Sequence, residues 1–282
     1  MKSRLSGVLE ASFCLSLTGM EDLLLLADEV GSTIEYIVTA IGASPQRNEP
    51  FPHLQLANVF PPHVYAGMIE AMPVPQDYRP MSGRTKYTRT QDGGGTRTKI
   101  DLFPEFIRHL PRAKKPVWKV VGRALCSAEV REAFRERLAP GLEKRFGERH
   151  RSLGMYPIPI LTRDVPGYEI GIHPDTRSKA MTIQLYLPSD RSIEHTGTVF
   201  HRRNGAGEFE RALQMPFAPN TGYAFAVAED TWHSVDALGP EVHTRDSILL
   251  TYFLDDSALD RTKNRVKRLA NFVRNEYRSL AR

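Results

Sequence analysis

The sequence predicts an α+β protein in which a core of short β-strands lies between helical segments. Between residues 155 and 254, short apolar runs are separated by turn-forming residues, as expected for a β-sandwich or barrel. Before and after this region, apolar residues recur at intervals of three and four, which is the spacing of an amphipathic helix. No internal repeat is apparent, and we therefore expect one large domain with helical flanks.

The composition allows a sizeable core and indicates a reducing compartment. The chain has 282 residues, of which 41% are apolar, and a net charge of +5 that weakly favours acidic partners. Its two cysteines, Cys14 and Cys126, neither form a disulfide framework nor lie in a zinc-like cluster. No apolar run approaches the ~20 residues of a membrane span, so we expect no membrane partner. With no convincing signal-peptide cleavage site, the prediction is a cytoplasmic protein.

Residues 1–50 are predicted to form an N-terminal helical extension. Thr18 and Glu21 have the spacing of a capping box, and apolar residues then follow at helical spacing to Ile41, with a probable break at Gly31-Ser32. Met20 is a second candidate for the start of the protein. A linker follows at residues 44–52, and a short strand is expected near residues 54–59.

Residues 61–146 are predicted to be mainly helical, apart from one long loop. Pro61 and Pro62 suit the first turn of a helix that ends near Met72. Residues 73–99 are polar, turn-rich and basic around three consecutive glycines, which indicates either a solvated loop or a lid. A helical pattern occupies residues 103–146, with a second helix from about Ala128 to Leu138.

The C-terminal residues 255–282 predict a basic amphipathic helix. Its apolar stripe consists of Leu259, Val266, Leu269, Val273, Tyr277 and Leu280. We expect this helix to dock on its own domain, while a contact with nucleic acid, with an acidic partner or with a second copy stays open.

Three residues in the strand-rich region have the composition of an iron site. His173 and Asp175 are two positions apart, so they project from the same face of a strand. His233 follows 58 positions after Asp175, next to the apolar run 223–227. Two histidines and one carboxylate, with the opposite side of the metal open, are the ligands of non-haem Fe(II) oxygenases.

The order of four motif residues resembles a known family. His173-x-Asp175, His233 and then Arg245-x-Ser247 resemble the Fe(II)- and 2-oxoglutarate-dependent dioxygenases, in particular the prolyl-hydroxylase-like branch, over roughly residues 51–254. The resemblance implies a dioxygenase domain with a double-stranded β-helix (jelly-roll or cupin-like) core at 155–254. It also implies Fe(II), 2-oxoglutarate and O2 as cofactors, and hydroxylation of an unactivated C–H bond with release of succinate and CO2.

Arg245 is the expected anchor of the co-substrate. A buried arginine is costly without a carboxylate that matches its planar fork. Asp246 faces the other way, and the resemblance supplies the distal carboxylate of 2-oxoglutarate as the partner. Ser247 and Tyr186 are expected by the same resemblance to add hydroxyl contacts to this carboxylate.

Other residues are predicted to line the pocket. Thr182 and Gln184 share a strand face with Tyr186, and polar side chains aimed into a barrel indicate a lined cavity. Arg163 and Lys179 match positions that in related proteins point toward co-substrate or substrate. Trp232 is either a core residue or a substrate contact.

The substrate itself is not determined by these patterns. A small molecule and a peptidyl residue are both compatible with them, and Asp175 favours hydroxylation or desaturation, because related halogenases replace this carboxylate by a small residue. A nucleic-acid-directed oxidative demethylase and a non-catalytic jelly-roll binding module are the alternatives. Oligomeric state stays open.

Overall fold

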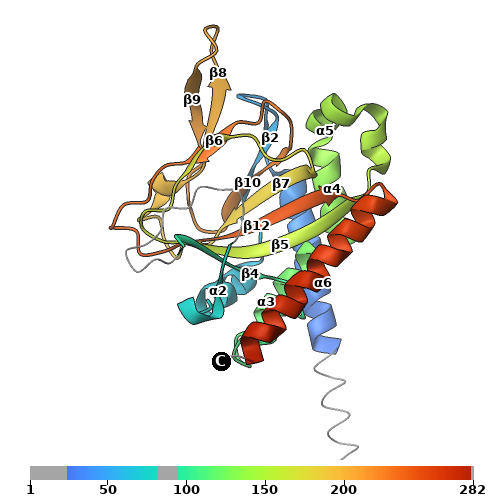
Figure 1. Ribbon diagram of the computed structural model, residues 1–282, viewed down its shortest axis with the longest axis vertical. Helices are drawn as coiled ribbons and strands as arrows, with labels where there is room; N and C mark the ends of the chain where they lie inside the picture. The colour runs from blue at the N-terminus through green and yellow to red at the C-terminus, as the bar shows by residue number, and fades with distance from the viewer. Residues whose placement is uncertain (1–23, 82–94, 281–282) are drawn as a thin grey trace, which may run out of the picture.

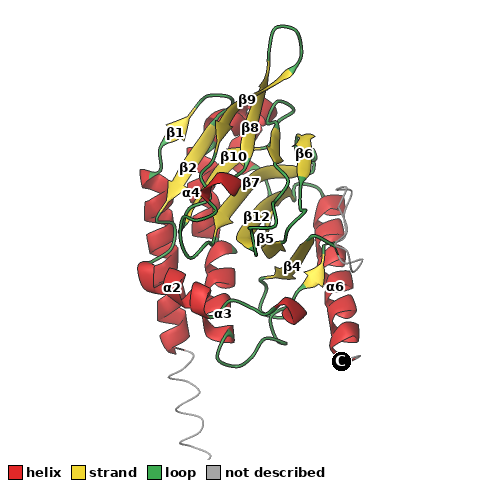
Figure 2. Ribbon diagram, turned by 90° about the vertical axis from the view of Figure 1, so that its left-hand side faces the viewer, coloured by secondary structure: helices red, strands yellow, loops and turns green. Residues whose placement is uncertain are grey.

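The computed structural model describes residues 24–81 and 95–280 of the chain, which form two antiparallel sheets and surrounding helices (Figures 1 and 2). Within these residues, the larger sheet has eight strands in the order β1-β2-β10-β7-β12-β5-β4-β3, and the smaller has four in the order β6-β11-β8-β9. The cavity described below opens between the two sheets.

The core of the fold is a double-stranded β-helix, as the family resemblance implied. From β5 onward the chain passes back and forth between the sheets: β5, β7, β10 and β12 lie in the larger one, and β6, β8, β9 and β11 in the smaller one. The strands span Met155–Asp164 (β5), Ile170–His173 (β6), Lys179–Tyr186 (β7), Val199–Arg203 (β8), Phe209–Gln214 (β9), Thr221–Ala226 (β10), His233–Val235 (β11) and Arg245–Leu254 (β12). The apolar runs of this region, at residues 158–161, 181–187, 223–227 and 248–254, coincide with β5, β7, β10 and β12.

Four earlier strands extend the larger sheet at its two edges. They are β1 (Gln46–Arg47), β2 (His53–Ala57), β3 (Arg79–Pro80) and β4 (Arg97–Asp101). β2 pairs with β10, which confirms the strand predicted near residues 54–59, and β4 pairs with β5.

The alternation of side chains along β7 separates core from cavity. Ile183 and Leu185 belong to the main apolar cluster, which the helices cover, whereas Thr182 and Gln184 line the cavity on the opposite face. This arrangement confirms the prediction made from the strand period of two. A second, aromatic cluster that includes Phe200 and Phe225 fills part of the space between the sheets.

The helices cover the outer face of the larger sheet and its lower end (Figure 2). They comprise a helix over residues 24–43, α2 (Pro62–Glu70), α3 (Lys115–Leu125), α4 (Ala128–Arg137), α5 (Ala139–Phe146) and α6 (Ala258–Leu280), with short 3₁₀ turns η1 (Pro75–Asp77), η2 (Gly147–Ser152) and η3 (Glu194–Thr196). Trp118 of α3 and Phe134 of α4 are fully buried against the sheet.

Two helix predictions need correction. The predicted break at Gly31-Ser32 is absent, and the helix runs unbroken from residue 24 to 43 because Thr33, Ile37 and Ile41 are completely buried along it. Residues 102–114 are turns instead of helix, since Pro104 and Pro111 interrupt the helical pattern there.

Two further predictions concern residues outside the described part of the chain. The Thr18–Glu21 capping box and the middle of the predicted loop or lid, residues 82–94, lie there. The described parts of residues 73–99 contain η1, β3 and the start of β4. Among the described helices, none is long and apolar enough to cross a membrane.

A glycine in α3 permits close approach of the helix to the sheet. A Cβ atom at Gly122 would lie 2.0 Å from the carbonyl oxygen of Leu102, whereas a Cβ at Gly31, in the helix over residues 24–43, would meet nothing within 4 Å.

We expect Gly122→Ala to lower the free energy of unfolding by about 1 to 3 kcal/mol through overpacking. Gly31→Ala should raise it by about 0.5 to 1 kcal/mol through helix propensity. Urea unfolding of both variants measures this, and a stabilised Gly122→Ala protein would contradict it.

Candidate metal centre

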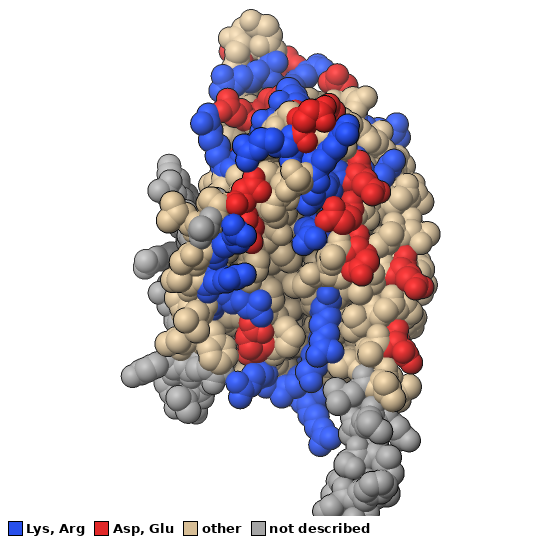
Figure 3. Space-filling model, turned by 90° about the vertical axis from the view of Figure 1, so that its right-hand side faces the viewer, with Lys and Arg blue, Asp and Glu red and all other residues tan. Residues whose placement is uncertain are grey.

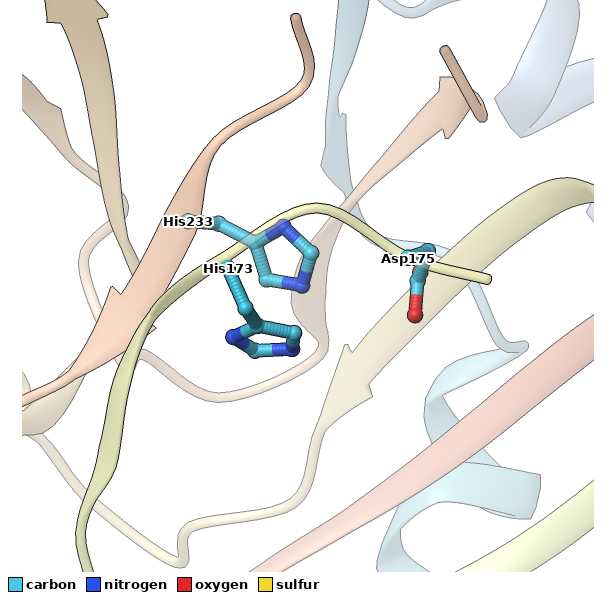
Figure 4. Close-up of side chains that lie close together, drawn as sticks. All are labelled: His173, Asp175 and His233. Carbon is cyan, nitrogen blue, oxygen red and sulfur yellow. The ribbon is translucent and has the colours of Figure 1, made fainter. Parts of the chain in front are cut away.

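Three side chains converge at the end of the smaller sheet. The ligating atoms of His173, Asp175 and His233 all lie within 4.8 Å of one another. His173, the last residue of β6, is the direct cross-strand partner of His233, the first residue of β11, and their ring centroids are 4.4 Å apart. Asp175 follows two residues after β6 ends, and its carboxylate is directed toward the same space (Figure 4). The structure therefore brings together the three predicted ligands.

The orientation of both imidazoles is fixed by backbone carbonyls. Nδ1 of His173 lies 2.8 Å from the carbonyl oxygen of Gly171, and Nδ1 of His233 lies 3.0 Å from that of Thr231. A carbonyl oxygen can only accept, so each Nδ1 must carry the hydrogen. Each neutral ring then keeps its lone pair on Nε2, the atom available to a metal.

Burial and local charges set the protonation state of two of the ligands. Burial lowers the pKa of His233 to about 4, although the Asp175 carboxylate partly opposes this. For Asp175, burial favours the neutral acid, but the positive charges of Lys179 and His233 and hydrogen bonds outweigh it and lower the pKa to about 2. At neutral pH the pair is thus an uncharged imidazole and an ionised carboxylate, the forms that bind metal.

Both oxygens of Asp175 have hydrogen-bond donors. Lys179 Nζ lies 2.5 Å from one oxygen, and the hydroxyl of Thr182 lies 2.6 Å from the other. Both donors come from β7, the strand that follows the ligand loop. β7 therefore holds the carboxylate in position opposite the two rings. The residues predicted as a substrate contact (Lys179) and a co-substrate contact (Thr182) have this positioning role in the structure.

A cavity of about 1060 Å³ extends from the three ligands between the two sheets. Its wall includes Thr182 and Gln184 from β7, Tyr223 from β10, and Arg245 and Leu249 from β12. On the other side it is bounded by residues 168–176 and by part of the β8–β9 hairpin. The three candidate ligands thus lie at the wall of a space large enough for a small-molecule ligand and part of a second molecule.

Arg245 is almost completely buried and only partly paired. Its Nε donates to the carbonyl oxygen of Thr196 at 2.8 Å, and its Nη1 donates to Asp164 at 2.9 Å. Its Nη2 has no hydrogen-bond partner. A buried, unpaired guanidinium N–H at the wall of a cavity fits an anionic ligand such as a carboxylate.

Asp164 is the partner that sequence reasoning missed. This fully buried carboxylate also accepts two hydrogen bonds from Arg97, at 2.5 and 2.7 Å, so that it lies between two arginines. Asp164 is opposite Arg245 in the register of β5 and β12, and opposite Arg97 in that of β4 and β5. The guanidinium of Arg245 therefore already has one carboxylate, which corrects the expectation that only the co-substrate could pair with it.

Ser247 and Tyr186 lie behind the cavity wall instead of in it. The Ser247 hydroxyl accepts a hydrogen bond from Gln184 and lies 2.9 Å from the Thr162 hydroxyl, and it does not line the cavity. The Tyr186 hydroxyl lies 3.1 Å from both the hydroxyl and the amide nitrogen of Thr198, which itself lines the cavity. Tyr223 and Thr198 are among the hydroxyl-bearing residues that do line the cavity.

Arg163 points away from the cavity. Its Nε and Nη2 donate to the two oxygens of Asp246, at 2.8 and 3.1 Å, and its guanidinium stacks on Tyr78 at 4.6 Å. Arg163 and Asp246 are cross-strand partners on the face opposite Asp164 and Arg245, which explains why the position was misassigned. We therefore no longer expect Arg163 to contact the co-substrate.

Trp232 lies outside the cavity wall as well. It is half-buried, and its ring packs against Phe209 at 4.8 Å while the guanidinium of Arg203 lies 5.1 Å from it. His201, which is not among the predicted site residues, does line the cavity and hydrogen-bonds the Ser234 hydroxyl at 2.8 Å. Its neighbour Phe200 is the cross-strand partner of His233, a pairing that only the structure shows.

Comparisons with known proteins give similar structures without similar sequences. No family model and no curated protein matches this chain. The chain is similar to prolyl hydroxylases and to a 2OG-Fe(II) oxygenase. A Pseudomonas putida prolyl-4-hydroxylase matches with 15% identity over 79% of this chain and 100% of its own, with a TM-score of 0.46.

Two further structures have comparable values. A Trichoplax adhaerens prolyl hydroxylase in complex with a hypoxia inducible factor peptide fragment is 12% identical over 82% of this chain and 92% of its own, with a TM-score of 0.48. A Burkholderia pseudomallei oxidoreductase of the 2OG-Fe(II) oxygenase family is 14% identical over 83% and 92%, with a TM-score of 0.45. The assignment of the fold rests on the strand order of the two sheets.

The buried, neutral state of His233 predicts how stability depends on pH. In the unfolded chain this histidine takes up a proton near its ordinary pKa of 6.5, and in the folded protein only near pH 4. The contribution of His233 to folding is therefore complete above pH 6.5 and falls as the pH drops toward 4. It amounts to up to about 3 kcal/mol.

We expect the free energy of unfolding of the metal-free protein to fall as the pH drops from 6.5 to 4. The decrease should be clearly smaller in the His233→Asn variant. Urea unfolding in the presence of a chelator at several pH values measures the difference. Asp175 acts in a separate range, between its ordinary pKa of 3.8 and about 2. Equal slopes for the two proteins between pH 6.5 and 4 would contradict the prediction.

Proposed function

We propose that this protein is an Fe(II)- and 2-oxoglutarate-dependent oxygenase that hydroxylates a C–H bond of a small-molecule or peptidyl substrate. The observation that carries the proposal is the cluster of His173, Asp175 and His233 at the wall of a cavity. The Nδ1 atom of each histidine is hydrogen-bonded to a backbone carbonyl oxygen, which leaves Nε2 available to a metal. Two imidazoles and one carboxylate leave coordination positions open, and this donor set suits Fe(II).

The protein residues have separable tasks in this proposal. Iron at the cluster would supply the redox chemistry by which 2-oxoglutarate, O2 and the substrate are converted to succinate, CO2 and the hydroxylated substrate. Lys179 and Thr182 hold Asp175 ionised and oriented toward the two rings. The Gly171 and Thr231 carbonyl oxygens keep Nε2 of each histidine directed at the same point.

The end of the cavity at Arg245 contains the groups that we expect to bind the co-substrate. The unpaired Nη2 of Arg245 is the N–H group that we expect to meet the distal carboxylate of 2-oxoglutarate. Asp164 accepts from Nη1 of the same side chain and so fixes the plane of its guanidinium. Tyr223, Thr198 and Gln184 supply polar groups along the path between Arg245 and the metal ligands.

Removal of one ligand should abolish metal binding while leaving the fold intact. His173 is only partly buried, so His173→Ala should keep the unfolding midpoint and lower the affinity for Mn(II), a redox-stable probe for this site, at least about 100-fold. Electron paramagnetic resonance of bound Mn(II) measures the affinity. His195→Ala, at an exposed histidine outside the cluster, is the matched control and should bind as the wild type does. Retention of Mn(II) affinity in His173→Ala would refute the metal site.

The co-substrate role of Arg245 is tested by a charge-conserving change. Arg245→Lys keeps a cation next to Asp164 but loses the second N–H. We therefore expect the Kd for 2-oxoglutarate, measured by calorimetry on the Mn(II)-loaded protein, to rise about 10- to 100-fold.

Arg163→Lys is the control for this change. It alters another buried, carboxylate-paired arginine that faces away from the cavity, and its Kd should stay within error of the wild type. Equal affinities in the Arg245 variant and the wild type would remove 2-oxoglutarate from the proposal. Iron-dependent formation of succinate from 2-oxoglutarate separates an enzyme from a non-catalytic binding module.

A further inference from the structure

The C-terminal helix α6 presents its apolar side chains to solvent. Leu259 is 83% exposed, Val266 57%, Leu269 62% and Val273 54%. The intervals of seven, three and four residues between them place all four on one side of a helix. At 1.5 Å per residue this apolar stripe is roughly 21 Å long. Single exposed apolar residues are ordinary, but four in a row along one helix are not.

The opposite side of α6 is attached to the domain by polar contacts and by the packing of Phe272 on Phe106, whose ring centroids are 6.2 Å apart. Asn264 is buried and donates to the carbonyl oxygen of Leu254 and to Asp255. Arg268 pairs with Glu105 at 2.5 Å, donates to the Tyr156 hydroxyl and stacks on Phe103 at 4.1 Å.

These contacts fix the rotation of the helix so that the stripe faces outward. α6 therefore docks on its own domain, as predicted. The side that makes the contact, however, is opposite the apolar stripe and not the stripe itself.

The net positive charge of the protein is concentrated on the same helix. The 23 residues of α6 contain seven Lys and Arg and two Asp and Glu, a net charge of +5. The whole chain also has a net charge of +5, so the remaining 259 residues sum to zero. Figure 3 shows the side of the molecule that adjoins α6, with Lys and Arg side chains predominating in the lower half of this face.

Two observations argue against a helical partner on this stripe. A coiled-coil seam needs apolar residues at both of two alternating positions, and the positions that would complete it beside Leu259 and Val273 hold Thr262 and Glu276. A second copy of this chain would in addition bring two helices of charge +5 against each other. A narrow apolar stripe on a basic helix instead suits a surface that is both apolar and anionic.

We propose that α6 lies flat on an anionic lipid surface and attaches the protein to it as a peripheral contact. The four stripe residues would enter the boundary between headgroups and acyl chains, while the exposed arginines Arg261 and Arg265 reach lipid phosphates. The sequence analysis expected no membrane partner because no segment is apolar enough to cross a membrane, but contact with a membrane surface requires no such segment. This inference is independent of the proposed oxygenase activity.

Vesicle sedimentation with the full-length protein tests the proposal. We expect binding to vesicles of phosphatidylcholine mixed with phosphatidylglycerol, little binding to phosphatidylcholine alone, and a steep loss between about 0.1 M and about 1 M salt. The double variant Val266→Ser/Leu269→Ser should bind the mixed vesicles at least about tenfold more weakly. Val74→Ser changes an exposed valine (47%) elsewhere on the surface and should bind as the wild type does.

Several results would overturn the proposal. These are absence of binding to the mixed vesicles, equal binding to both kinds of vesicle, and undiminished binding of a double variant whose thermal unfolding matches the wild type. A concentration-dependent dimer, seen by light scattering and abolished in the double variant, would instead make the stripe a self-association surface. Because the lipid and salt dependences are measured on the unaltered protein, the test does not depend on the variant folding.

Discussion

The antiparallel pairing of β6 with β11 is the constraint on which the site depends. It puts His173 and His233, which are 60 positions apart in the chain, directly opposite each other. Strand partners on one face are close enough for their side chains to share a ligand. The chain reaches this pairing because the double-stranded β-helix returns it to the smaller sheet after β10. The loop after β6 then needs only two residues to bring Asp175 to the same point.

Hydrogen bonds hold the three side chains of this cluster in position. β7 lies at the centre of the larger sheet, between β10 and β12, and carries both groups that hold Asp175. Backbone carbonyls hold the two imidazoles. The ligand positions are therefore set by hydrogen bonds formed on folding, and the buried charge of Asp175 is offset by Lys179 before any metal binds.

At the Arg245 end of the cavity, the buried charges belong to arginine–aspartate pairs. Asp164 lies between Arg97 and Arg245 and pairs with both. The unpaired Nη2 of Arg245 favours an anion in the cavity. A second buried pair, Arg163 with Asp246, is neutral as a unit and faces away from the cavity, where it ties β5 to β12 without attracting a ligand.

The sequence by itself determined the strand-rich core, the helical flanks and the three candidate ligands that the structure brings together, because these depend on local periodicity and on the order of a few residues. A period of two decided that Thr182 and Gln184 face away from Ile183, and that His173 and Asp175 act together. Only the tertiary structure decided which of two adjacent arginine–aspartate pairs lines the cavity, since that depends on how β5 is aligned with β12.

Only the tertiary structure also decided that the stripe of α6 faces outward. Helical periodicity fixes which residues share a side, whereas contacts with distant residues such as Glu105 and Tyr156 fix how that side is rotated.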